Sequence, residues 1–271
     1  MLTPKELMSF AQEKKLTLFS ITDHDTISGT IIAKEMSEDY PFSFLTGLEL
    51  SSRYENEKIE ILGYNFDSLN SRFNQQLESL QKARRKRVHK VIERLAEVGV
   101  VLNYEEILDQ IGEGVSAGRP HFARALVKKG IVKDIREAFD VYLAKGKPGY
   151  VPRETIEPKE AIKLIHSAKG TAVLPHPLIV ASGDLQKLNY YLELLLEWGL
   201  EGIEVYYNYE YHCPKLSKSI VERGMKLLID FCKKNELLMT GGSDFHHQRE
   251  IFGEVAIPKN EIHKLIKHFT S

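Results

Sequence analysis

The sequence contains very little cysteine. Its 271 residues include two, Cys213 and Cys232, and their spacing forms no CxxC pair. This excludes a scaffold held together by disulfides and a zinc site built from thiolates. Two isolated cysteines in a chain of this length are typical of a reducing compartment. We therefore expect a cytoplasmic protein in which both are small core residues.

The sequence also lacks a charge excess and a long apolar run. The formal net charge is -1, so no global basic field attracts nucleic acid, and any such contact must be local. Charged residues occupy segment 1–15, where a signal peptide needs apolar ones. The most apolar stretch, 190–200, is too short and too charged to cross a bilayer. We expect no membrane contact.

Several sequence motifs of common enzyme classes are missing. No GxSxG, P-loop or GxGxxG motif occurs, which argues against a serine nucleophile and against NAD or ATP as a cofactor. Hydrophobic residues make up 42% of the chain, an ordinary value for a globular protein. The chain is long enough to bury a sizeable core as one large α/β domain or as a domain carrying an insertion.

Strand and helix patterns alternate in the first and last thirds of the chain. Short apolar runs predict strands at 16–22, 42–51, 58–64, 171–177, 202–207 and 237–247. Such repeated units predict a mostly parallel sheet or barrel. The middle is helical throughout, with predicted helices at 81–100, 104–111, 121–130 and 135–146. This break in the alternation predicts an insertion, which divides the chain into 1–75, an inserted helical domain at 76–148, and 149–271.

Imidazoles and carboxylates recur where the predicted strands end. Each one alone is more often a helix cap or a turn residue, but an acidic residue in an apolar strand is costly unless something pairs with it. Carboxyl ends of parallel strands form one rim, so these positions can converge on one pocket. Nitrogen and oxygen donors without thiolates suit zinc, manganese or iron. The residues concerned are Asp23, His24, Asp25, Glu49, Glu60, His176, Asp244 and His246.

The order of these motifs resembles that of the PHP (polymerase and histidinol phosphatase) superfamily. The matching strings are TDHDT at 22–26, GLELS at 47–51, ILGY at 61–64, the His176-Pro177 turn and GSDFH at 242–246. The helical middle resembles the insertion of the branch that contains 3′,5′-nucleoside bisphosphate phosphatases and 5′-end exoribonucleases. The resemblance implies a distorted (β/α)7-type barrel with an inserted small all-helical domain.

The same resemblance implies a site for two or three divalent ions (Mn, Zn, Fe or Mg) on the rim. The ligands carried over by motif are His24, Glu49, His176, Asp244 and His246. Glu60 stands where the family usually has a histidine, so it is either a replacement ligand or a lost one. Asp23 and Asp25 are expected to support His24. We expect Asp23, His24 and Asp244 to take part in catalysis.

The chain begins at a point where the resembling proteins are already past their first strand. Those proteins start with an HxH motif and an SDG string, followed by a helix similar to LTPKEL, and this sequence starts at that helix. Either it begins at an internal methionine of a longer product or it is a true truncation. Because the later motifs are intact, we favour the first.

Substrate binding is expected in the insertion. Arg119 and His121 follow Gly118 at a predicted helix start, where free backbone N–H groups favour an anion. An equally open alternative is that Arg119 pairs with a carboxylate. Lys145 and Lys147 are weaker candidates. The basic run at 82–87 is more typical of a solvated helix face. Four other histidines, His166, His247, His263 and His268, are expected to play no part.

The function expected from these features is hydrolysis of nucleotide phosphoesters by metal-activated water. The substrate is either a 3′,5′-bisphosphate nucleotide or short RNA cleaved from its 5′ end, and no obligate protein partner is evident. Two alternatives stay open. One is a histidinol phosphatase, against which the insertion argues. The other is a metal- or nucleotide-binding protein of weakened activity, because the first ligand motif is missing.

Overall fold

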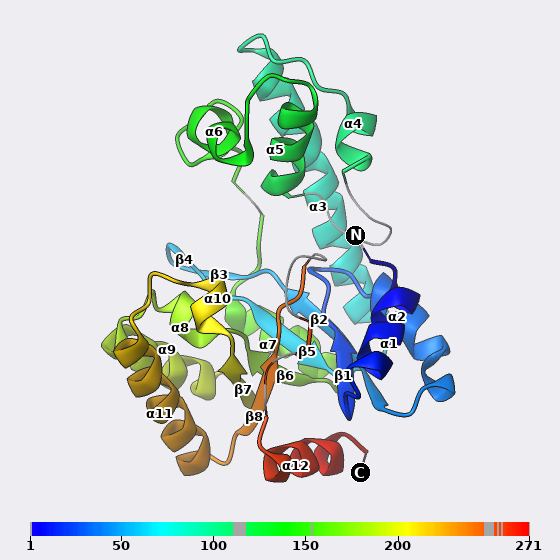
Figure 1. The fold of residues 1–271 in the computed structure, drawn as a ribbon, viewed down its shortest axis with the longest axis vertical. Coiled ribbons are helices and arrows are strands. Elements are labelled where there is room, and N and C mark those ends of the chain that lie inside the picture. Colours follow the sequence, from blue (N-terminus) through cyan, green and yellow to red (C-terminus); the bar gives the residue numbers. More distant parts are fainter. Residues whose placement is uncertain are drawn as a thin grey trace. The chain divides into compact units, whose positions relative to one another are not determined.

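The computed structural model describes residues 2–110, 118–152, 154–246, 252–253, 255 and 257–270. The chain divides into two compact units. The larger contains residues 2–74 and 156–271, and the smaller contains residues 75–155. The predicted α/β class is confirmed, because the larger unit is a sheet covered by helices and the smaller unit is helical (Figure 1).

A six-stranded sheet forms the centre of the larger unit, in the order β1-β2-β5-β6-β7-β8. Its strands are β1 (Leu18–Ile21), β2 (Ser43–Leu50), β5 (Ile61–Tyr64), β6 (Thr171–Leu174), β7 (Gly202–Tyr207) and β8 (Leu238–Gly242). The pairs β1–β2, β6–β7 and β7–β8 are parallel. Their carboxyl ends therefore lie at one edge of the sheet, as the sequence pattern predicted.

The direction of β5 differs from the expectation of a continuous βα alternation. It runs antiparallel to both β2 and β6. The predicted strand at 58–64 is also divided, because Glu57–Lys58 forms β4, which pairs with β3 (Arg53–Tyr54) in a separate hairpin. Glu60 therefore precedes β5 instead of ending a strand. Since β5 is reversed, its beginning lies at the edge where β2 and β6 end, and Glu60 reaches the same rim.

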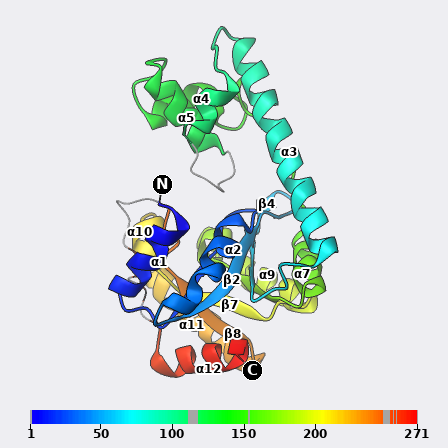
Figure 2. The same ribbon diagram turned by 90° about the vertical axis from the view of Figure 1, so that its right-hand side faces the viewer.

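Amphipathic helices cover the sheet. Helix α1 (Pro4–Glu13) starts with a capping box in which the Thr3 hydroxyl accepts from the Glu6 N–H, and Pro4 fits the first turn. It lies beside α2 (Ser28–Glu35), which packs on β1 and β2 (Figure 2). The other covering helices are α7 (Pro158–Ser167), α9 (Leu185–Glu197), α11 (Lys218–Lys234) and α12 (Lys259–Thr270).

Short helical turns complete the larger unit. They are η1 (Ser37–Asp39), α8 (Pro177–Val180) and α10 (Tyr209–His212). Cys232 is buried, as expected, but Cys213 is only half-buried beside α10, so the prediction of two core cysteines is wrong for Cys213. Within the described part of the chain, no helix combines the length and apolarity needed to cross a membrane.

The smaller unit has a core of its own. It consists of most of α3 (Ser71–Ala96) with α4 (Tyr104–Leu108), α5 (Arg119–Lys128) and α6 (Ile135–Ala138). Val91 and Leu95 of α3 pack with Phe122 and Leu126 of α5, and all four side chains are fully buried. The predicted helix at 135–146 is not one regular helix, because α6 passes into a π-helical turn, η2 (Phe139–Leu143).

Candidate metal centre

The loop after β1 and the end of β2 form the first part of the rim. Here β1 and β2 continue their pairing through backbone hydrogen bonds. The Glu49 N–H donates to Asp23 O at 3.1 Å, and the Asp25 N–H donates to Glu49 O at 2.9 Å. His24 is thereby held opposite Glu49 in an isolated parallel bridge. The backbone thus fixes an imidazole and a carboxylate side by side.

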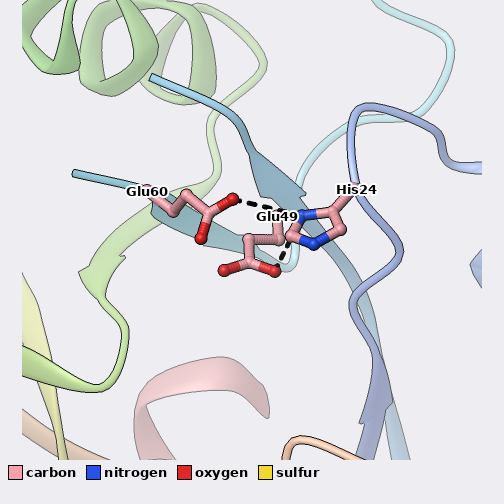
Figure 3. A group of neighbouring side chains, drawn as sticks. All are labelled: His24, Glu49 and Glu60. Carbon is pink, nitrogen blue, oxygen red and sulfur yellow. Dashed lines mark ion pairs between the residues drawn. The ribbon is translucent and has the colours of Figure 1, made fainter. Parts of the chain in front are cut away.

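His24, Glu49 and Glu60 form a group of three side chains whose donor atoms lie within 4.8 Å of one another. His24 Nδ1 is 2.9 Å from Glu49 Oε2 and 3.5 Å from Glu60 Oε1. Figure 3 shows this nitrogen facing both carboxylates. Glu49 is 7% exposed and Glu60 is 2% exposed. Two buried carboxylates beside one imidazole are a donor set of the kind that holds a divalent cation.

His176 joins the group from the turn after β6. Its Nε2 lies 3.4 Å from Glu49 Oε1 and 3.9 Å from Glu60 Oε2. Its backbone is left-handed, with φ at 33°, a conformation that non-glycine residues rarely adopt and that clusters at functional sites. Glu49 therefore lies between two imidazoles, with one oxygen toward each.

Asp244 and His246 follow β8 on the same rim. Asp244 Oδ2 accepts a hydrogen bond of 2.8 Å from the Tyr207 hydroxyl, and the backbone of Asp244 is also left-handed, with φ at 48°. His246 Nδ1 lies 2.7 Å from Asp244 O, and its ring centroid is 6.5 Å from that of His24. The structure thus brings His24, Glu49, Glu60 and His176 into direct contact and places Asp244 and His246 at the neighbouring strand end.

Burial and the charges of neighbouring side chains together set the pKa values of the centre's residues. Burial alone would raise the pKa of Glu49, but His24 and His176 hold it well below its usual range. Burial and the nearby charge of Glu49 raise the pKa of Glu60. Burial would lower the pKa of His176, yet its hydrogen bond to Glu49 and the charges of Glu49, Glu204 and Asp244 raise it to about 9.

Asp23 and Asp25 lie on either side of His24. Burial raises the pKa of Asp23 against the opposing charges of His24 and His246, so its carboxyl lies near both rings. A Cβ at Gly29 would be 2.5 Å from Asp23 Oδ2, so glycine makes room for this carboxyl. Asp25 is buried, and its Oδ1 accepts a hydrogen bond of 2.6 Å from the Ser51 N–H. Asp25 therefore ties the turn after β1 to the end of β2.

Sequence reasoning missed two residues of this region, Glu204 and Tyr207, both on β7. Glu204 is 5% exposed, and its Oε2 accepts a hydrogen bond of 2.9 Å from the His176 backbone N–H. Burial, with smaller contributions from Asp244 and Glu49, raises the pKa of Glu204 to about 8. The signal was present, because an acidic residue in the apolar strand GIEVYY is as anomalous as Glu49 in GLELS.

The two predicted substrate residues, Arg119 and His121, lie at the start of α5 in the smaller unit. The Arg119 guanidinium is 5.8 Å from the Phe139 ring centroid and 5.7 Å from that of Tyr150. His121 is buried, and its Nδ1 accepts a 2.8 Å hydrogen bond from the Gly118 N–H. Burial and the charge of Arg124 lower the pKa of His121 to about 4. This nitrogen caps the start of α5.

The other basic residues of the smaller unit only partly follow the expectation of a solvated face. Arg84 is buried, and Arg87 is half-buried with its Nε donating to Val151 O at 2.9 Å. The prediction was wrong for these two, because α3 packs this face into the unit's core. Lys145 and Lys147 are exposed.

Three of the histidines expected to be uninvolved lie at the surface. His166 forms an ion pair of 2.8 Å with Glu201 at the surface. His263 and His268 lie on α12 and are exposed. His247 lies outside the described residues.

Comparisons with known proteins show similarity to exoribonucleases and to a nucleotide phosphatase. A 5′-3′ exoribonuclease of Haemophilus influenzae is 29% identical over 248 residues, 90% of this chain and 85% of that protein. The 5′-3′ exoribonuclease Rnm of Salmonella typhimurium is 34% identical over 65% of this chain and 61% of the relative. A 3′,5′-nucleoside bisphosphate phosphatase of Chromobacterium violaceum is 31% identical over 65% and 62%, respectively. In these two comparisons the aligned segment spans less than two thirds of the relative's length.

A solved structure matches nearly the whole chain. It comes from Bifidobacterium adolescentis and is assigned as a metal-dependent phosphoesterase, with 26% identity and a TM-score of 0.80 over 98% of this chain and 91% of that one. These likenesses are consistent with the resemblance of the motifs to the PHP superfamily. No protein-family model matches it.

The likeness to these proteins confirms the predicted enzyme class, a metal-dependent phosphoesterase. It also agrees with the group of His24, Glu49 and Glu60, whose donors suit a divalent metal. The three relatives named above are two exoribonucleases and a nucleotide phosphatase, which favours the nucleotide expectation over a histidinol phosphatase.

Proposed function

We propose that this protein hydrolyses phosphoesters of nucleotides, either 3′,5′-bisphosphate nucleotides or short RNA from its 5′ end. The observation that carries the proposal is the contact of two buried carboxylates, Glu49 and Glu60, with His24 and His176 at the strand-end rim. The substrate class comes from the relatives' names and from the arginines of the smaller unit.

The residues present fit divalent cations. Glu60 Oε1 and His176 Nδ1 are buried and have no hydrogen-bond partner within the described part of the chain, which is unusual for native polar atoms unless a ligand completes the site. We assign His24, Glu49, Glu60, His176, Asp244 and His246 as the ligand set. Carboxylates and imidazoles together suit manganese, zinc, iron or magnesium, and this number of donors is enough for two ions.

A bound divalent cation would lower the pKa of water and stabilise charge on phosphate oxygens. The chain's own residues supply orientation and proton transfer. Glu49 presents one oxygen toward His24 and the other toward His176, so it can join two cation positions. Burial raises the pKa of Asp23, whose carboxyl lies near His24 and His246, and we propose that it holds a proton for the leaving oxygen. Tyr207 orients the Asp244 carboxylate by donating to its Oδ2.

Arg119 is the proposed grip on a second phosphate. Its guanidinium lies over the Phe139 and Tyr150 rings, and the N–H donors of a guanidinium can bind an oxyanion in pairs. The nearby Arg119 charge adds to burial in lowering the pKa of Arg87. Among the described residues neither arginine has a carboxylate partner, so the pair suits an anionic ligand.

The test compares metal content with turnover in the purified chain. We expect bound transition metal and faster hydrolysis of a 3′,5′-bisphosphate nucleotide or a 5′-phosphorylated oligoribonucleotide than of an aryl phosphate or histidinol phosphate. Preference for histidinol phosphate would support the alternative phosphatase. Bound metal without turnover of any of the four would instead identify a protein of weakened activity.

Replacing Glu60 tests whether it is a ligand. Glu60→Ala removes a buried carboxylate that lies 3.5 Å from His24 Nδ1, so we expect metal occupancy to fall. Glu60→His restores the residue type usual in the family, so activity should be kept or should rise. Metal analysis after dialysis measures the first effect, and Glu193→Ala, at an exposed position on α9, is the control. Unchanged occupancy in Glu60→Ala would show that Glu60 is not a ligand.

Replacing Arg119 tests the phosphate grip. We expect Arg119→Ala to weaken a 3′,5′-bisphosphate substrate by about 1.5–3 kcal/mol, the range for hydrogen bonds to a charged group. The loss should appear in KM if the second phosphate is bound equally in ground and transition states. An aryl phosphate lacks that group and should be unaffected, as should the exposed control Arg136→Ala. Equal loss for both substrates would place Arg119 at the scissile phosphate, and no loss would leave it a purely structural role.

A further inference from the structure

His176 and Asp244, two of the proposed ligands, share an unfavourable backbone conformation. Both are non-glycine residues in the left-handed region, with φ at 33° and 48°. Such a conformation persists only when surrounding contacts over-determine it. The residues that supply these contacts therefore decide where the two side chains point.

The contact to His176 comes from Glu204 on β7. The Glu204 carboxylate is buried and accepts the His176 backbone N–H at 2.9 Å. Its other oxygen faces the end of β8, because a Cβ at Gly242 would lie 2.8 Å from Glu204 Oε1. One carboxylate thus fits between the turn after β6 and the strand end that leads to Asp244.

The contacts to the Asp244 turn come from the next residues of the same segment. The Tyr207 hydroxyl donates to Asp244 Oδ2 at 2.8 Å, and the Tyr207 ring centroid is 5.7 Å from that of His176. On α10, His212 Nε2 lies 2.9 Å from Ser243 O. Since a carbonyl only accepts, the imidazole must donate this bond. One stretch of chain, from Glu204 to His212, therefore holds both turns.

We infer that Glu204 and Tyr207 are positioning residues that hold His176 and Asp244 in metal-binding geometry. The inference rests on the proposed function, because it takes those two residues to be ligands. Groups that orient metal ligands through hydrogen bonds commonly change metal affinity or activity by about 10- to 100-fold when removed. Glu204 holds His176 by accepting a hydrogen bond from the His176 backbone N–H. Its effect on metal binding should therefore depend on an acceptor oxygen and not on its charge.

The experiment uses the full chain stripped of metal and titrated with Mn²⁺, read by the electron paramagnetic resonance of the free ion. The variants are Glu204→Leu, Glu204→Gln and Tyr207→Phe. Tyr206→Phe is the matched control, because it makes the same change one residue earlier on β7. The titratable groups near the Tyr206 side chain are Glu261 and Cys232, not the rim residues. Thermal melting of each metal-free variant establishes that it is folded, and kcat and KM are measured with an aryl phosphate.

We expect Glu204→Leu and Tyr207→Phe to weaken Mn²⁺ binding about 10- to 100-fold and to lower kcat more than they change KM. Glu204→Gln keeps an acceptor oxygen and should stay close to the wild type, as should Tyr206→Phe. If Glu204→Gln loses as much as Glu204→Leu, Glu204 acts through its charge, and the positioning role is overturned. Wild-type affinity in both Glu204→Leu and Tyr207→Phe would also overturn it. Failure of the wild type to bind Mn²⁺ would instead count against the proposed function.

Discussion

Glu49→Gln should abolish most of the hydrolytic activity while leaving the fold intact. Glu49 lies between the two imidazoles, 2.9 Å from His24 Nδ1 and 3.4 Å from His176 Nε2, and it is 7% exposed. The amide keeps the shape of the side chain but removes the negative charge and leaves a poor ligand. Because metal stabilisation of phosphoryl chemistry is worth several kcal/mol, we expect kcat/KM to fall by about three orders of magnitude.

The measurement combines turnover with metal content. Glu193→Gln makes the same chemical change at an exposed position of α9 and should match the wild type in both. Circular dichroism melting of the metal-free proteins separates loss of metal from loss of fold. Metal content and turnover within about threefold of the wild type in Glu49→Gln would remove Glu49 from the ligand set.

Glu49 also shows how much of the centre a sequence can reveal. A carboxylate inside an apolar strand is unfavourable unless it is paired, and this argument selects Glu49 and Glu60 from the sequence alone. The same argument applies to Glu204 in GIEVYY, a strand for which the resemblance supplies no motif. Its partner is a backbone N–H 28 residues away in the chain, a contact that only the fold reveals.

The fold was predictable in class but not in strand direction. Repeated βα patterns predicted a mostly parallel sheet, and the pairs β1–β2, β6–β7 and β7–β8 are parallel. The four residues of β5, Ile61–Tyr64, are a short apolar run without a helix before it, and such a run carries no signal of direction. The reversal of β5 places Glu60 on the rim. Glu60 was expected at this edge of the sheet and lies there, but the strand direction assumed in that expectation was wrong.

Helix caps also account for features of the fold that the hydrophobic pattern of the sequence does not show. The Asn70 side chain accepts from the Phe73 N–H and starts α3 at Ser71, ten residues before the amphipathic pattern that predicted the helix at 81–100. His121 was expected to contact substrate because it follows Gly118 and Arg119. In the fold its Nδ1 accepts from the Gly118 N–H, a local capping contact that uses the same residues.

Metal affinity should rise steeply with pH between 7 and 9. In the metal-free protein the hydrogen bond to Glu49 and the charges of Glu49, Glu204 and Asp244 outweigh burial and raise the pKa of His176 to about 9. The ring therefore holds a proton at pH 7 and must lose it to bind a cation, because only the neutral imidazole is a ligand. We expect about a tenfold gain in apparent affinity per pH unit up to about pH 9, and a plateau above it.

The stability of the metal-free protein should change in the opposite direction. A folded-state pKa of His176 raised to about 9 stabilises the fold fully below the unfolded histidine pKa, and this contribution is lost as the pH rises through 9. The pKa of Glu204, raised by burial to about 8, acts with the same sign, because ionising this buried carboxyl disfavours the fold. The metal-free melting temperature should therefore fall from pH 7 to 9 while the metal affinity rises.

Two measurements check this pair of trends. Calorimetric titration with Mn²⁺ in buffers of different ionisation enthalpy counts the protons released, and at least one should be released at pH 7. The shift depends on Glu49, so in Glu49→Gln the metal-free melting temperature should fall less steeply over the same range. An affinity that is already level at pH 7, with no proton release, would mean that His176 is neutral there. The raised pKa would then have no part in metal binding.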